Sequence, residues 1–282
     1  MLCKAYAKIN LGLRVIRKRE DGFHDIETIF HRINLFDELT LEPSPRSISI
    51  TCSNPAIPAD ENNLCWKAAE TLRNMLGAEK GALIHLKKNI PVGAGLGGGS
   101  SDAAAVLLSL PSLWNIPVDP STLAEIALQI GSDVPFFLHN RSAYAEGRGE
   151  RLQFITLSLP YWILVVTPSV HISTAWAYRE LSARTRQDLQ PAKFYDGATC
   201  KLARISTLMQ NDFEDVVFPI HTEVAEIRKQ LLTRGAAFAL MSGSGSSVFG
   251  LFEDADTADN VGRFFGTQYQ ISITEPHFLP TI

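Results

Sequence analysis

The stretch PVGAGLGGGSSDAA at residues 91–104 holds five glycines, two serines and no lysine. Glycine-rich loops let backbone N–H groups approach a bound group closely, most often a phosphate. The P-loop pattern G-x-x-x-x-G-K-[ST] requires a lysine directly before its serine or threonine, where this chain has Gly99. The stretch therefore predicts a phosphate-binding loop of another type, whose cation comes from elsewhere in the chain.

The same glycines also satisfy the dinucleotide pattern G-x-G-x-x-G, at Gly93, Gly95 and Gly98. That fingerprint needs an acidic residue about 20 positions on, at the end of a second strand. The only candidate, Asp119, precedes a proline that begins a helix, so a Rossmann fold is excluded. A protein kinase is excluded as well, because no VAIK, HRD or DFG segment occurs.

A glycine turn that only packs tightly is the structural alternative, and it accounts poorly for five glycines followed by a helix. Residues 100–110, SSDAAAVLLSL, favour a helix whose first three residues are natural caps. We therefore expect backbone amides and the positive end of this helix to hold the anion.

Hydrophobic periodicity divides the chain into two α+β halves. Residues 5–16 alternate and predict a half-buried strand with Lys8 and Asn10 together on its polar face. The first half adds strands at 24–42, 47–52 and 81–91 and helices at 62–76, 100–110 and 119–131. From about 160 the pattern restarts with a strand, helices to 234, a strand with its own glycine cluster, a helix and a last strand. The expected boundary lies near 155–160.

Two charged residues stand in unusual surroundings. Lys8 lies in an otherwise apolar or small strand, which is costly for an ammonium without a partner. Asp133 follows a helix stop and precedes the apolar run VPFF. The ordinary alternatives remain open: Lys8 extends its ammonium from the strand edge to solvent, and Asp133 is a turn or capping residue.

Composition sets the class of protein. With 45% hydrophobic and 20% charged residues the chain is typical of a soluble globular protein, and its net charge of −4 argues against nucleic-acid and anionic-membrane partners. The N-terminus does not resemble a signal peptide, and four scattered cysteines favour free thiols in a reducing cytoplasm. The seven histidines show no metal-binding spacing, so no metal ligand is predicted.

Three segments, in order and spacing, resemble the motifs of the GHMP kinase superfamily: AKINLGL (7–13), the glycine loop, and MSGSGSSVFG (241–250). REDGFHDIETIF (19–30) and GSDVPFF (131–137) are similar to the members that phosphorylate a cytidine-diphosphate-linked methylerythritol in the non-mevalonate route to isoprenoids. The resemblance implies a ribosomal-protein-S5-like ATP domain at 1–157 and a ferredoxin-like α+β domain at 158–282. It also implies ATP as co-substrate, with Mg²⁺ expected alongside the nucleotide.

The resemblance assigns roles to individual positions. Lys8 and Asp133 match the catalytic pair. The ATP-binding positions are Pro91, Val92, Gly93, Ala94, Gly95, Leu96, Gly97, Gly98, Gly99, Ser100 and Ser101. The substrate-binding positions are Asn10, Phe23, His24, Phe30, Thr174 and Tyr178. Position 23 departs from the pattern, since tyrosine is more usual there; phenylalanine retains stacking and loses a phenolic hydrogen bond.

Two other functions stay in view. Another small-molecule kinase of the superfamily, for mevalonate or homoserine, shares the general motifs, and the DGFH segment speaks against it. A catalytically inactive nucleotide-binding regulator is the alternative from another class. Such a protein would be expected to lose Lys8 or Asp133, and both are present.

Overall fold

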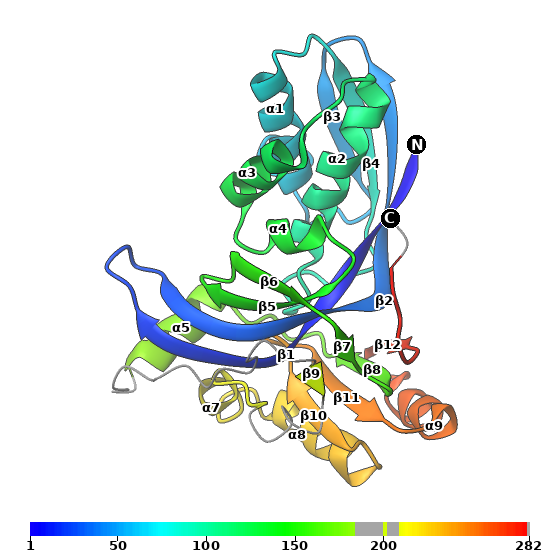
Figure 1. Cartoon of the computed structure of the whole chain (residues 1–282). Coiled ribbons are helices and arrows are strands. Elements are labelled where there is room, and N and C mark those ends of the chain that lie inside the picture. The colour runs from blue at the N-terminus through cyan, green and yellow to red at the C-terminus, as the bar shows by residue number, and fades with distance from the viewer. Residues whose placement is uncertain (184–199, 202–208, 281–282) are drawn as a thin grey trace.

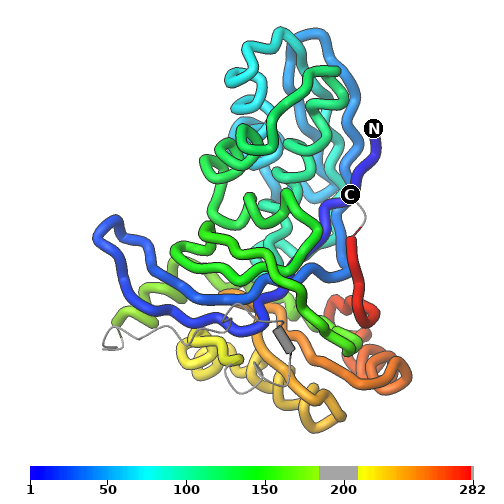
Figure 2. Tube along the Cα trace, in the orientation of Figure 1, coloured from blue at the N-terminus to red at the C-terminus, as the bar shows by residue number. Residues whose placement is uncertain are grey.

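The chain forms two packed halves joined by a long hairpin (Figures 1 and 2). The computed structural model describes residues 1–183, 200–201 and 209–280, so the side chain of Cys200 and part of the expected helical region before 234 lie outside the described residues. The N-terminal elements are β1 (Leu2–Lys18), β2 (His24–Ser44), β3 (Ile48–Cys52), α1 (Leu64–Leu76), β4 (Gly81–Lys87), α2 (Gly98–Trp114), α3 (Pro120–Ile130), α4 (Val134–Phe137), β5 (Ser142–Gly147) and β6 (Arg151–Ile155). The C-terminal elements are β7 (Leu157–Ser158), β8 (Trp162–Thr167), α5 (Thr174–Ala183), β9 (Cys200–Lys201), α7 (Glu214–Val217), α8 (Thr222–Thr233), β10 (Phe238–Met241), β11 (Val248–Phe252), α9 (Ala255–Phe265) and β12 (Gln270–Thr274).

The N-terminal half is a sheet covered by helices on one face. Its strands run in the order β3-β4-β2-β5-β6, with β1 paired to β2, and α2 packs on β1 and β2. Leu72 of α1 and Leu107 of α2 are among its fully buried side chains. The expected boundary at 157/158 falls inside the two-residue strand β7.

The C-terminal half is a four-stranded antiparallel sheet in the order β10-β11-β8-β12. Counted along the chain, this order is 2-3-1-4, the arrangement of a ferredoxin-like fold. Helix α8 packs on β10 and β11, and α9 packs on β8 and β12. The α+β class and the two-part architecture expected from the sequence are thus confirmed.

The β1–β2 hairpin spans both halves and reaches α5 at its tip (Figure 1). Its register shifts between Asn10 and Leu13, where Gly12 has φ +88°, a left-handed conformation that suits glycine. The prediction of a half-buried strand here is wrong, because Lys8 and Asn10 are 4% and 1% exposed. The polar face of β1 is covered by the glycine loop and by the C-terminal half rather than by water.

The start of α2 also differs from the sequence prediction. The helix begins at Gly98, two residues early, and its N-cap Gly97 provides no side-chain hydrogen bond. Ser101 does not cap the helix; its hydroxyl donates to the carbonyl of Tyr6 at 2.7 Å. Because the N-cap and the first two helical residues are glycines, these positions have no side chain that could compete for the amides at this helix end.

Two other sequence predictions concern the end of β4 and the position of the second glycine cluster. Strand β4 ends at Lys87 rather than continuing to Pro91, because the backbone N–H groups of Asn89 and Ile90 donate to Asp37 Oδ1 at 2.6 and 2.8 Å. The second glycine cluster, residues 242–247, is the connection between β10 and β11. Among the described residues no helix combines the length and apolarity needed to cross a bilayer.

Candidate active site

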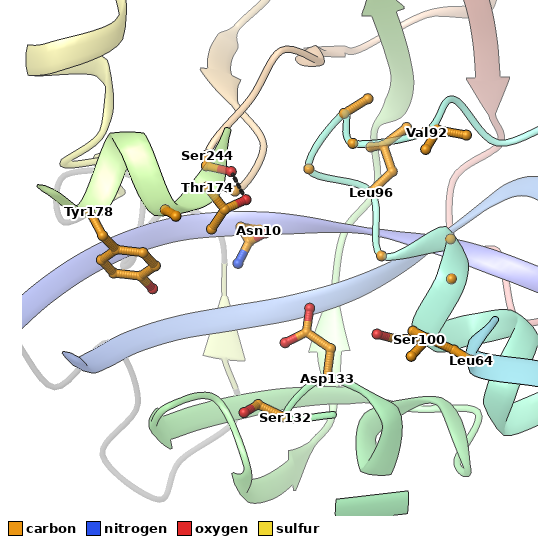
Figure 3. Close-up of a pocket in the computed structure, with 18 of the residues that line it drawn as sticks. Asn10, Leu64, Val92, Leu96, Ser100, Ser132, Asp133, Thr174, Tyr178 and Ser244 are labelled. Carbon is orange, nitrogen blue, oxygen red and sulfur yellow. Dashed lines mark hydrogen bonds between the residues drawn. The ribbon is translucent and has the colours of Figure 1, made fainter. Parts of the chain in front are cut away.

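A cavity of about 1190 Å³ lies between the glycine loop, the β1–β2 hairpin and α5 (Figure 3). It receives the catalytic candidates Lys8 and Asp133, residues 91–100 of the glycine loop, and all six substrate-binding candidates. The exception among the sequence-predicted residues is Ser101, which is 2% exposed and does not line this cavity. One hollow therefore gathers candidates that lie up to 170 positions apart (Lys8 to Tyr178) in the sequence.

Lys8 and Asp133 face each other inside this cavity. Lys8 Nζ lies 3.8 Å from Asp133 Oδ2, and the two side chains are 5% and 33% exposed. The ammonium donates to Asn10 Oδ1 at 2.6 Å and to the carbonyl of Gly95 at 3.3 Å. Burial lowers the pKa of Lys8, and the charge of Asp133 partly opposes that effect. The lysine is a buried, oriented cation rather than a side chain that reaches solvent.

Asp133 precedes the short helix α4 without capping it. No side-chain capping hydrogen bond is present at this N-cap position. Within the described part of the chain no hydrogen bond to its carboxylate is found, and Lys8 is its ion-pair partner. Figure 3 shows the carboxylate extending into the cavity between Asn10 and Ser100. A carboxylate that makes no capping hydrogen bond and points into a cavity can take part in a reaction there.

Asn10 links the lysine to the strand behind it. Its amide donates from Nδ2 to Thr28 Oγ1 at 2.9 Å, and Thr28 in turn donates to the carbonyl of Gly12 at 2.5 Å. Because both ends of the amide are used, the orientation of Asn10 is fixed, and its oxygen faces Lys8.

The glycine loop is pressed against the 242–247 connection. Gly95 has φ +80°, and a Cβ there would lie 2.0 Å from the carbonyl oxygen of Ser242. Gly97 has φ +71°, and Ser242 Oγ donates to the Gly95 carbonyl at 3.0 Å. The first turn-closing bond of α2 joins the N–H of Ser101 to the carbonyl of Gly97 at 2.9 Å. The preceding amides of α2 therefore have no partner within the helix and form an anion-binding helix start.

Lys88 is a cation of the site that sequence reasoning missed. It lines the cavity and forms ion pairs with Asp37 and with Asp102, the latter at 2.7 Å. Burial lowers the pKa of Lys88, but the charges of Asp102 and Asp37 outweigh this and leave it raised. The other oxygen of Asp102, Oδ1, is buried with no hydrogen-bond partner in the described structure. A lysine directly before the glycine loop was the available signal.

Aromatic side chains form the end of the cavity opposite the glycine loop. The His24 ring stacks on Tyr178 with centroids 4.6 Å apart and planes 18° apart, and Phe213 meets Tyr178 edge-on at 4.8 Å. Phe23 is 52% exposed, and the Arg148 guanidinium lies 4.7 Å from its ring centroid. Thr174, one turn before Tyr178 on α5, shares a 2.8 Å hydrogen bond with Ser244 (Figure 3).

The charge of the cavity is opposite to that of the whole chain. The described basic residues that line it outnumber the acidic ones, Asp102 and Asp133; they are Lys8, Lys18, Lys88, Arg148 and Arg179. A chain with net charge −4 therefore presents a locally positive cavity, which favours polyphosphate ligands. The described residues include no group of three or more His, Cys, Asp or Glu side chains that could hold a metal ion on their own.

The sequence is similar to known families and proteins. The sequence matches the family of GHMP kinases N terminal domain over residues 63–141 and that of GHMP kinases C terminal over residues 198–271. It is 46% identical over 278 residues to the 4-diphosphocytidyl-2-C-methyl-D-erythritol kinase of Chlorobium phaeobacteroides strain BS1, covering 98% of this chain and 97% of that protein.

Solved structures agree as well. A crystal structure of 4-(cytidine 5′-diphospho)-2C-methyl-D-erythritol kinase superposes with a TM-score of 0.80 at 35% identity, covering 97% of this chain and 98% of that one. A homoserine kinase from Cytophaga hutchinsonii superposes with a TM-score of 0.71 at 18% identity, covering 100% and 95% of the two chains, and shares the fold alone. The chain is therefore a small-molecule kinase, and it belongs to the 4-diphosphocytidyl-2-C-methyl-D-erythritol kinase family of the GHMP kinases.

Proposed function

We propose that this enzyme transfers the γ-phosphoryl group of ATP to the 2-hydroxyl of 4-diphosphocytidyl-2-C-methyl-D-erythritol, a step of the non-mevalonate route to isoprenoid precursors. The observation that carries the proposal is the pair of buried Lys8 and partly exposed Asp133, which faces the glycine loop across one positive cavity. Phosphoryl transfer needs mainly positioning and charge stabilisation, and this arrangement supplies both.

Asp133 is the proposed base. Its carboxylate accepts the proton of the attacking hydroxyl. The hydroxyl can approach because no described residue donates a hydrogen bond to the carboxylate. Lys8, held by Asn10, offsets negative charge on the phosphoryl group as it transfers. The inactive-regulator alternative has no support in this pair, since both residues are present and oriented.

Residues 91–100 are the proposed ATP site. The amides at the start of α2 and the backbone of the loop bind the phosphates, and the left-handed glycines permit the close approach. Ser101 contributes structurally, through its bond to Tyr6, rather than by contact with the nucleotide.

The site also fits a Mg²⁺ ion held largely by the nucleotide. Mg²⁺ commonly takes one or two protein oxygens together with phosphates and waters, and the Ser100 hydroxyl lines the cavity as one such oxygen. The unpartnered Oδ1 of Asp102 lies in the same helix turn. When bound, the ion neutralises phosphate charge; the chain itself binds and orients the reactants.

The aromatic end of the cavity is the proposed base site. Phe23 and Tyr178 supply aromatic surface, His24 supplies a polar edge, and Asn10, Phe30 and Thr174 line the path from the base to Asp133. Cytosine presents an amino donor where uracil presents a carbonyl acceptor. A buried group matched to the donor is left unpaired by uracil, at about 1–3 kcal/mol.

The domain boundary is proposed from the sheets, and a cytoplasmic location is proposed from the cysteines. The two sheets support domains at 1–157 and 158–282. The thiols of Cys3, Cys52 and Cys65 are free, as suits a reducing cytoplasm.

A substrate panel with radiolabelled ATP tests the function. We expect kcat/KM for the cytidine-linked substrate to exceed that for its uridine-linked analogue by at least ~10²-fold. Free methylerythritol phosphate, mevalonate and homoserine should be poor substrates, because they lack the base that orients the hydroxyl. Efficient phosphorylation of mevalonate or homoserine, or indifference between the two bases, would refute the proposal.

A further inference from the structure

His24 and Ser182 join the hairpin tip to α5 at the aromatic end of the cavity. His24 Nε2 lies 2.7 Å from Ser182 Oγ, although the two residues are 158 positions apart. The same imidazole stacks on Tyr178, one turn before Ser182 on α5. Both His24 and Ser182 line the cavity that contains Asp133. The imidazole is thus held at its face and at one nitrogen.

The proton of the Ser182 hydroxyl is already assigned by a second contact. Ser182 Oγ donates to the carbonyl oxygen of Tyr178 at 2.8 Å. A carbonyl oxygen can only accept, so both contacts of Ser182 Oγ are hydrogen bonds only when the single hydroxyl proton lies between the two oxygens. The contact with His24 must then use a lone pair of Ser182 Oγ. It follows that His24 Nε2 carries a proton and donates it.

This assignment fixes the chemistry of the other ring nitrogen. Burial, with a smaller effect from the charge of Lys18, lowers the pKa of His24, so the ring is neutral at neutral pH. In a neutral imidazole with hydrogen on Nε2, Nδ1 carries a lone pair and only accepts. Within the described part of the chain no donor reaches Nδ1. Nδ1 is therefore an acceptor that the described residues leave open, on a side chain that lines the cavity.

We propose that Ser182 is a positioning residue for base selection: it holds His24 in the form with hydrogen on Nε2, so that Nδ1 accepts from the exocyclic amino group of cytosine and repels the carbonyl oxygen of uracil. This inference rests on the proposed cytidine-linked substrate. Ser182 acts through His24 and needs no contact with the substrate. This gives a role to a serine of α5 that lines the cavity.

Three variants test the assignment by kinetics. Ser182→Ala removes the acceptor of the Nε2 proton, Ser182→Thr keeps a hydroxyl, and Ser121→Ala changes an exposed serine of α3 outside the cavity. We expect Ser182→Ala to lower the cytidine-over-uridine ratio of kcat/KM by about tenfold, chiefly by raising KM for the cytidine-linked substrate. Ser182→Thr should restore most of the ratio, and Ser121→Ala should leave it unchanged.

The tautomer itself is measured by ¹⁵N NMR of protein labelled at the histidine ring nitrogens. In the wild type we expect a protonated-type shift at Nε2 and an unprotonated-type shift at Nδ1, and in Ser182→Ala a shift of both toward the average of two tautomers. A wild-type ring with hydrogen on Nδ1, or an unchanged base ratio in Ser182→Ala, overturns the inference while leaving the proposed function intact. Absence of wild-type turnover of the cytidine-linked substrate instead overturns the function, and the inference with it.

Discussion

Lys8 approaches Asp133 to 3.8 Å, while its short contact, 2.6 Å, is with Asn10 Oδ1. The ammonium is therefore aimed by an amide and leaves the carboxylate free of a tight ion pair. An Asp133 locked onto Lys8 would be a weak acceptor for a substrate proton. The looser pair keeps the two charges close enough to act on one reacting centre without cancelling each other.

Asp133→Asn should retain nucleotide binding and lower kcat by at least ~10²-fold, because it removes a positioned base while keeping the side-chain volume. Steady-state kinetics and calorimetric titration with ADP separate the two effects. Asp119→Asn is the matched control, an aspartate at the start of α3 that likewise makes no capping bond and lies outside the cavity. Near-wild-type turnover in Asp133→Asn would reduce Asp133 to a turn residue.

At alkaline pH the deprotonation of Lys8 should lower the activity, while the contribution of Lys8 to the free energy of unfolding rises. Its folded pKa is lowered below 10.5, so between the two values the unfolded chain binds a proton that the folded chain lacks. The contribution of this group to the free energy of unfolding therefore rises with pH across that window. Activity that needs the ammonium falls across the same window.

Urea unfolding and kcat measured from neutral pH to 10.5 check both trends, with Lys8→Met as the comparison. The variant should lose most of its kcat, keep its affinity for ATP, and show a flatter stability profile. A variant that only raised KM for ATP would make Lys8 a simple phosphate ligand.

Gly95→Ala should weaken ADP binding by more than about tenfold, because the new Cβ meets the Ser242 carbonyl and the backbone keeps φ +80°. The larger Gly95→Val should abolish binding. Gly99→Ala is the control within the same loop: its Cβ would meet only Leu64 Cδ1, at 3.5 Å, and its φ is not left-handed. Equal affinities in Gly95→Ala and Gly99→Ala would contradict the tight packing of the two loops.

Lys88→Met should lower the free energy of unfolding by about 3–5 kcal/mol, since it strands Asp37 and Asp102 in a buried site without their cation. The folded pKa of Lys88 is raised, so its stabilisation is fully present below 10.5 and is lost as pH rises through the raised value. Denaturant unfolding at neutral pH measures the effect. Adding Asp102→Asn to Lys88→Met should recover part of the loss, and a further loss in the double variant would argue against the ion-pair account.

Features set by a local sequence pattern could be predicted from the sequence, whereas features set by contacts between distant residues could not. The glycine loop and the Lys8 and Asp133 segments are contiguous motifs, and the structure brings them to one cavity. The Lys88–Asp37 pair joins residues 51 positions apart, and no periodicity links them. The start of α2 was missed because Ser100 and Ser101 are strong capping residues and glycines are poor helix formers.

Burial of β1 was missed for a related reason. Alternation reports which face of a strand is apolar, and here the polar face is covered by a second half of the protein and by a ligand cavity. Tertiary packing decided the environment of Lys8, while the pattern of the strand remained that of an ordinary half-exposed one.

The β1–β2 hairpin carries both the proposed base-contacting residues, near its tip, and the proposed catalytic lysine. Its tip, residues 19–23, is braced by Arg19 pairing with Asp21 and Asp25. Lys8 and Asn10 lie far down β1, on the face that lines the cavity, while residues 7, 9 and 11 of the same strand belong to a hydrophobic core shared by both halves. The tip and the segment that contains Lys8 and Asn10 are thus separate parts of the same hairpin. The proposed base contacts near the tip, Phe23 and His24, can therefore change without any change at Lys8 or Asn10.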